Sequence, residues 1–142
     1  MKRSIPRKHP EASVADQLFR ELTKWERHVC GHSPGYLTLS RDRLWWEPHS
    51  MSILSQGFDL SLADVMRVEE SDNWLWRGAV NIVLKQPLHQ DVSFRLDPDA
   101  LVDGMEEHVF DSTTLRLFLG FHQKRFLRLA EECGIPAVRR GR

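Results

Sequence analysis

The first regular pattern of apolar residues lies near the N-terminus and consists of Val14, Leu18, Leu22 and Trp25. Steps of three and four place side chains on one face of an α-helix, and Ser13 precedes the series as a suitable N-cap. The pattern predicts an amphipathic N-terminal helix. The glycine- and proline-containing stretch 31–34 then interrupts any regular element.

From residue 35 the apolar spacing changes to two. Apolar side chains alternate with polar ones on both sides of a polar turn, 40-SRDR-43, and this predicts a β-hairpin that ends near Pro48. The inward row of the hairpin is Leu37, Leu39, Leu44 and Trp46. Trp45 then points outward, because neighbouring side chains on a strand face opposite sides. We expect the N-terminal helix to cover Trp45, ahead of a partner chain or a ligand.

Further segments also alternate with a period of two, and these are 58–62, 63–69 after a kink, 74–85 and 92–96. In the third of these, the row that we expect to be buried is Trp74, Trp76, Val80, Ile82 and Leu84. Gly78 lies in the same row, at a position that suits a bulge or a close approach of backbone. The polar stretch 86–91 is expected to connect the last two strands.

The C-terminal third combines an acidic, turn-rich loop over 97–111 with a helix over 112–133. The helical residues recur at threes and fours, and they are Leu115, Phe118, Leu119, His122, Phe126, Leu129 and Cys133. Gly134 and Pro136 supply a stop. The pattern therefore predicts a mainly β domain with α-helices. It has six to seven antiparallel strands in a strongly bent sheet, a long C-terminal helix as a cap and an extra N-terminal helix.

Three stretches of this pattern resemble the pleckstrin-homology superfold, and within it the GRAM-type and bacterial PH-like domains. They are 35-GYLTLSRDRLWWEP-48, 59-DLSLADVMRVEE-70, and the hairpin 80–96 with the helix that follows it. The resemblance covers about two-thirds of the chain. It implies a bent β-sheet or β-barrel without catalytic machinery or cofactors, which binds phosphoinositides, proteins or peptides, or serves as an adaptor. The N-terminal helix and the long acidic loop depart from the family pattern.

Composition and charge narrow the function further. The chain has 142 residues, of which 41% are hydrophobic, and its 20 basic and 20 acidic side chains cancel. This composition is typical of one globular domain, and the balanced charge disfavours specific nucleic-acid binding. We place a single domain at 13–136 between flexible basic ends at 1–12 and 137–142. With two cysteines and no signal-peptide or membrane-spanning pattern, a cytoplasmic protein, peripheral to membranes at most, is expected.

A phosphoinositide site requires several cationic side chains that converge on one head group. The candidate residues for a ligand or partner are Arg41, Arg43, Trp45, Arg67, Arg77 and Lys85. The dense cluster of lysine and arginine typical of such sites is absent from the sequence. An anionic lipid head group therefore stays an alternative ligand, and solvated turn and strand charges are the simpler interpretation.

Zinc-competent residues occur at a spacing of two in His28, Cys30 and His32, and a fourth ligand is required from His49, His89 or Cys133. Structural zinc sites use tighter paired spacing, so a buried cysteine flanked by strand-end histidines is the simpler interpretation. We therefore expect no metal and no cofactor. The sequence favours a non-enzymatic module that binds a protein or peptide, and the two terminal helices are a candidate surface for a homo-dimer.

Overall fold

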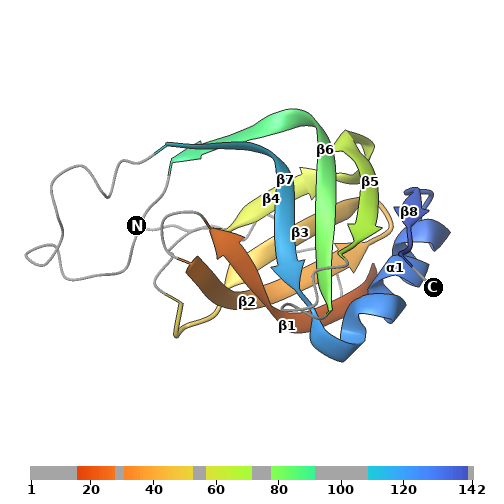
Figure 1. Cartoon of the computed structure of the whole chain (residues 1–142), viewed down its shortest axis with the longest axis horizontal. Coiled ribbons are helices and arrows are strands. Elements are labelled where there is room, and N and C mark those ends of the chain that lie inside the picture. The colour runs from red at the N-terminus through yellow and green to blue at the C-terminus, as the bar shows by residue number, and fades with distance from the viewer. Residues whose placement is uncertain (1–15, 28–30, 53–56, 72–77, 92–108, 141–142) are drawn as a thin grey trace, which may run out of the picture.

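The computed structural model describes residues 16–27, 31–52, 57–71, 78–91 and 109–140 (Figure 1). Within these residues the strands are β1 (Gln17–Arg27), β2 (Gly31–Ser40), β3 (Arg43–Pro48), β4 (Phe58–Ser61), β5 (Val65–Glu70), β6 (Ala79–Asp91), β7 (Val109–Phe118) and β8 (Ala137–Val138). The 3₁₀ turns η2 (Leu62–Asp64) and η5 (Gly120–His122) and the helix α1 (Gln123–Glu132) complete the described elements. The domain is mainly β with one C-terminal helix.

All eight strands belong to one open sheet in the order β4-β3-β2-β1-β7-β6-β5-β8. Neighbouring strands are antiparallel except β5 and β8, which run parallel. The sheet is therefore mixed, and its eight strands are one or two more than the six to seven antiparallel strands that we expected. β4 and β5 lie far apart in this order, yet only η2 (Leu62–Asp64) joins them. Three residues span little more than about 10 Å, so the sheet must curl back on itself.

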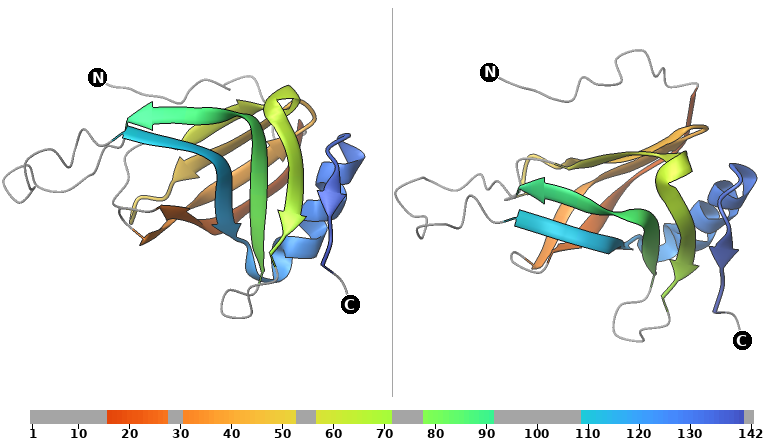
Figure 2. Two further views of the ribbon diagram at one scale, coloured as in Figure 1. Left: turned by 45° about the horizontal axis from the view of Figure 1, so that its top comes forward. Right: turned by 90° about the horizontal axis from the view of Figure 1, so that it is seen from above.

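The curled sheet encloses the core, and α1 lies across one of its ends (Figures 1 and 2). Phe126, Leu127 and Ala130 of α1 are fully buried against the sheet. Inside the sheet, aromatic side chains from β1, β3 and β4 form a cluster. The centre of the Trp25 ring lies 5.1 Å from that of Trp46 and 4.9 Å from that of Phe58. The buried residues of α1 and this aromatic cluster belong to one continuous hydrophobic core.

The hairpin predicted around residues 40–43 is confirmed. Leu37 pairs with Trp46 and Leu39 with Leu44 across β2 and β3, and all four side chains are buried. The turn between the strands is Arg41–Asp42, and β3 ends at Pro48. The predicted strand near residue 58 and the kinked strand after it are confirmed as β4, η2 and β5.

The buried row of the following strand is confirmed for Val80, Ile82 and Leu84, which are all inside. Gly78 precedes β6 with a φ of +84°, and a Cβ atom there would lie 2.5 Å from the Gly120 carbonyl oxygen. The close backbone approach expected at Gly78 is therefore present. Residues 86–91, however, are not a connection but continue β6, since Leu88 to Asp91 pair with β7.

The predicted N-terminal helix is wrong, because Gln17–Arg27 form β1 between β2 and β7. The inward row of β1 is Phe19, Glu21, Thr23 and Trp25. Polar Glu21 and Thr23 break the apolar alternation of that row, so the strand lacks the usual sequence pattern. Leu22, which we assigned to the buried helix face, points outward. The homo-dimer surface expected from two terminal helices therefore lacks its N-terminal member.

The predicted helix over 112–133 is wrong in its first half. Residues up to Phe118 belong to β7, and α1 begins only at Gln123. Leu115 and Leu117 are buried while Arg116 between them is half exposed, which is the alternation of a strand. The β-branched Thr113 and Thr114 also favour a strand.

Several expectations lie outside the described residues. They concern the flexible N-terminus 1–12, Trp74, Trp76, the strand at 92–96 and most of the acidic loop. At the other end, Ala137 and Val138 of the expected C-terminal tail form β8. Within the described residues, no helix is long and apolar enough to cross a membrane.

Candidate functional site

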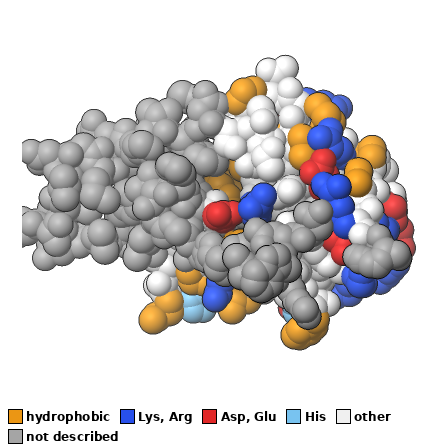
Figure 3. All heavy atoms as spheres, viewed as in Figure 1, with side chains coloured by type: hydrophobic (Ala, Val, Ile, Leu, Met, Phe, Trp, Pro, Cys, Tyr) orange, Lys and Arg blue, Asp and Glu red, His pale blue; other side chains and the backbone are white. Residues whose placement is uncertain are grey.

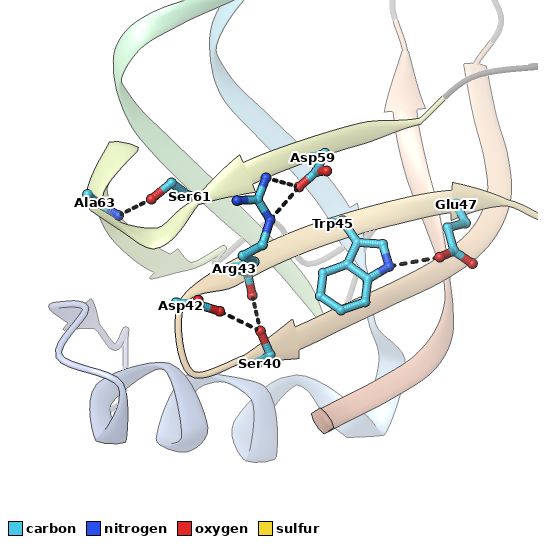
Figure 4. A network of polar contacts seen from close by, with 8 residues as sticks. All are labelled: Ser40, Asp42, Arg43, Trp45, Glu47, Asp59, Ser61 and Ala63. Carbon is cyan, nitrogen blue, oxygen red and sulfur yellow. Dashed lines mark hydrogen bonds and ion pairs between the residues drawn. The ribbon is translucent and has the colours of Figure 1, made fainter. Parts of the chain in front are cut away.

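The turn between β2 and β3 carries Arg41 and Arg43, the two arginines expected at an anion site. Arg41 is exposed on the turn. Arg43 points to the outer side of β3, where its Nη2 and Nε donate to Asp59 Oδ1 at 2.6 and 3.1 Å (Figure 4). Asp59 belongs to the neighbouring strand β4 and offsets the charge of Arg43. The turn therefore presents Arg41 alone rather than a pair of uncompensated cations.

Trp45 faces outward from β3, as the hairpin register predicts, because it lies opposite Thr38 and not in the Leu37 row. Its indole Nε1 donates to Glu47 Oε2 at 2.8 Å (Figure 4). The side chain is only 5% exposed, so its own chain covers it. The N-terminal helix that we expected as the cover is strand β1, which lies in the sheet beside β2. Trp45 offers no bare ring to a partner.

The remaining cationic candidates lie on the other half of the sheet. Arg67 of β5 is hydrogen-bonded through Nε to Glu69 on the same strand. Lys85 is exposed on β6, and Arg77 lies outside the described residues. Arg67 is paired with Glu69 and Arg43 with Asp59, so neither of these two charges is available to an anion shared with Lys85. The described candidates thus form no convergent anion pocket.

The zinc hypothesis rests mostly on residues outside the described part, since His28, Cys30 and the side chains of His32 and His89 are not described. The other two proposed ligands flank opposite ends of β2. The His49 amide donates to Pro34 O at 3.0 Å, and the Cys133 thiol lies 3.8 Å from Ser40 O. These anchor points are six residues apart on an extended strand, or about 20 Å. His49 and Cys133 therefore cannot bind the same ion.

Cys133 also lacks the surroundings of a reactive thiol. Burial raises the pKa of its thiol, and Glu132 adds to that increase, while the positive charge of Arg41 partly opposes it. A raised pKa leaves less thiolate, which is the form that attacks electrophiles and binds metals. Within the described ranges no group of three potential metal ligands comes together.

A charged cluster that the sequence did not reveal joins β1 to the start of α1. Glu21 on the inward side of β1 accepts a charge-assisted hydrogen bond from Arg125 Nη2, and its other oxygen lies 3.4 Å from His122 Nε2. The Arg125 guanidinium stacks 4.8 Å from the centre of the Phe19 ring. These contacts hold η5 and α1 against β1, and they fix the neighbouring residue Phe121 on the surface.

The outer side of β1 and β2 carries an exposed apolar strip. We define the outer strip as Leu22, Tyr36, His49, Met51 and Phe121. Leu22 lies opposite Tyr36 across the strand pair, the Tyr36 ring is 5.8 Å from His49, and the Met51 amide donates to His49 Nδ1 at 3.0 Å.

Phe121 on η5 adjoins β1 at the end of the outer strip, because its ring lies 4.3 Å from that of His122, whose Nε2 is 3.4 Å from Glu21, the chain neighbour of Leu22 on the opposite side of the strand. Phe121, Met51 and Leu22 are 92%, 78% and 51% exposed. Figure 3 shows two separate groups of hydrophobic side chains at the lower edge of the molecule, each with histidine beside it, on the side where β1 and β2 lie in Figure 1. Phe121, Met51 and Leu22 are the three most exposed large hydrophobic side chains among the described residues.

The two arginines beside the outer strip are paired with acidic side chains. Arg20 donates to Thr38 Oγ1 at 2.9 Å, lies 3.4 Å from Glu47, and stacks 4.7 Å from the Tyr36 ring centre. At the other end, Arg125 is paired with Glu21. Each arginine next to the strip therefore has an acidic partner on a neighbouring element.

The fold places the chain among mainly β domains with an open, curled sheet and one C-terminal helix. A solved structure has a similar fold. The crystal structure of the C-terminal domain of an unknown protein from Leishmania infantum matches with a TM-score of 0.51 at 12% sequence identity, over 82% of this chain and 83% of that one. At this identity the similarity concerns the fold alone. No family model and no curated protein sequence matches the chain.

Proposed function

We propose that the chain is a pleckstrin-homology-like, GRAM-type binding module without enzymatic activity, and that it engages a protein partner through the outer strip. The fold assignment is supported by two antiparallel meanders, β1 to β4 and β5 to β7, followed directly by α1. The observation that carries the binding function is the exposure of Leu22 and Met51 in the outer strip and of Phe121 at its end. Apolar residues exposed together in this way are typical of interaction surfaces.

A protein surface suits the outer strip better than an anionic membrane. Peripheral membrane binding depends on cationic side chains that remain available to acidic lipids. Arg20 and Arg125 beside the strip are instead neutralised by Glu47 and Glu21, and Arg43 by Asp59. We therefore propose a partner with an apolar patch that is surrounded by both acidic and basic side chains, as the outer strip is.

The test is capture of partners from a lysate of the native source by the wild type and by Leu22→Ser/Phe121→Ser. We expect the wild type to retain a partner whose affinity falls at least about tenfold in the double variant, because two exposed apolar anchors are lost. Met66→Ser is the matched control, since Met66 is 42% exposed on β5, outside the strip. It should bind like the wild type.

Two outcomes contradict the proposal. In one, Leu22→Ser/Phe121→Ser captures the same proteins with unchanged affinity, or the wild type captures none. In the other, the wild type binds acidic vesicles in a salt-sensitive way and Arg41→Ala/Arg43→Ala abolishes that binding. The second result would assign the module to anionic lipid.

A further inference from the structure

The edge of the sheet at β5 is occupied by the C-terminal segment of the same chain. β8 runs parallel to β5, with Val68 opposite Ala137 and Glu69 opposite Val138 (Figures 1 and 2). The Val68 amide donates to the Pro136 carbonyl at 2.9 Å. Residues 136–140, which we call the tail, thus act as a strand added to an otherwise open edge.

Two carboxylates hold the basic end of the tail. The Arg140 amide donates to Glu70 Oε1 at 3.1 Å, and its Nε donates to the Glu70 carbonyl at 3.1 Å. Arg139 Nη2 donates to Glu131 Oε1 on α1 at 2.7 Å. The edge of β5, together with Glu70 and Glu131, therefore binds an extended backbone that carries two small apolar residues followed by two arginines.

The tail pairs with only part of the β5 edge and buries little of its own surface there. β8 pairs with two of the six residues of β5. Val138 is 39% exposed, and Arg139 and Arg140 are exposed as well, whereas Ile135 just before the tail is buried. Short pairing with few buried contacts opens at low cost. A segment that continued the parallel pairing past Glu69, to Glu70, would make more backbone hydrogen bonds than the tail does.

We propose that the β5 edge is a strand-addition site for a partner segment that is extended, runs parallel to β5 and carries paired arginines, and that the tail keeps this site closed. In either occupant the Glu131 carboxylate binds the first arginine side chain, the Glu70 carboxylate accepts the backbone amide of the second arginine, and the Glu70 carbonyl accepts its Nε. Opening releases the hydrogen bond from the Val68 amide to the Pro136 carbonyl, while Ile135, just before the tail, stays buried. This site lies at the β5 edge and is separate from the outer strip on β1 and β2.

The test uses the full-length chain and a peptide with the sequence of residues 134–142 as the probe. Val138→Pro removes the backbone N–H of residue 138, so the tail loses a donor for pairing with β5. We expect the peptide to shift the NMR amide signals of Val68, Glu69 and Glu70 in Val138→Pro. Its affinity for the wild type should be weaker by about tenfold or more, since the site is open for only a fraction of the time.

Two controls assign the effect to the proposed contacts. A peptide with alanine in place of both arginines, and the variant Glu70→Gln/Val138→Pro, should each bind several-fold more weakly. The proposal is overturned if the wild type and Val138→Pro bind the peptide equally, or if neither binds it. It is also overturned if the shifts fall away from β5. Loss of the folded spectrum in Val138→Pro would show that the tail is a permanent strand, which again contradicts an exchangeable closure.

Discussion

Gly35→Ala is expected to lower the free energy of unfolding by about 3 kcal/mol, at the upper end of the usual cost of overpacking. A Cβ atom at residue 35 would lie 2.2 Å from Cζ2 of Trp46 and 2.5 Å from the Glu47 carbonyl oxygen. The Trp46 indole has no room to withdraw, because it is 1% exposed, and its Nε1 donates to Thr23 Oγ1 at 3.2 Å. Urea denaturation followed by circular dichroism measures the loss.

The matched control for this substitution is Gly134→Ala. Gly134 has a φ of +90° and nothing within 4 Å of an added Cβ, so alanine there incurs backbone strain without a steric clash. That strain costs about 1–2 kcal/mol. If Gly35→Ala proves no more damaging than Gly134→Ala, the close packing of Trp46 against β2 is not as described.

Leu117→Ala is expected to lower the free energy of unfolding by about 2–5 kcal/mol, the range for a large apolar side chain removed from a core. Leu117 is fully buried on β7, opposite Val80 on β6 and Trp25 on β1. Leu115→Ala should cost a similar amount, because it shares the inward row. Thermal and urea unfolding of each variant provide the measurement.

Arg116→Ala is the control that separates a strand from a helix in this segment. Arg116 faces outward, where its Nε donates to Asn81 Oδ1 at 3.0 Å and its Nη1 lies 3.6 Å from Glu26. Partly exposed pairs of this kind contribute about 1 kcal/mol or less. A loss from Arg116→Ala as large as that from Leu117→Ala would contradict the alternation of β7.

The hairpin of β2 and β3 could be predicted from the sequence because its signals are local. A polar turn sits between two alternating strands, and the parity alone separates Trp46 inside from Trp45 outside. β1 could not be predicted in the same way. Its inward row contains Glu21 and Thr23, whose polar groups are satisfied by Arg125 and by Trp46 and Gly35 from distant elements. Only tertiary contacts make that row a buried one.

The error in β7 arose from competing periods. Leu115, Phe118, Leu119 and Phe126 recur at helical spacing, yet this series runs through the end of β7, the η5 turn and α1. The outer strip had no sequence signal, because Leu22, Met51 and Phe121 come from separate segments. Among the candidate cations, the sequence could not show that Arg43 and Arg67 have acidic partners.

The most direct test of the proposed function is hydroxyl-radical footprinting of the wild type, alone and with the partner it captures. Met51 and Phe121 are the most exposed apolar side chains of the outer strip, so both should react readily in the free chain. We predict strong protection of Met51, Phe121 and Tyr36 by the partner, with Met66 on β5 unchanged. Unchanged reactivity of Met51 and Phe121, or protection confined to Met66, would contradict an interaction surface on the outer strip.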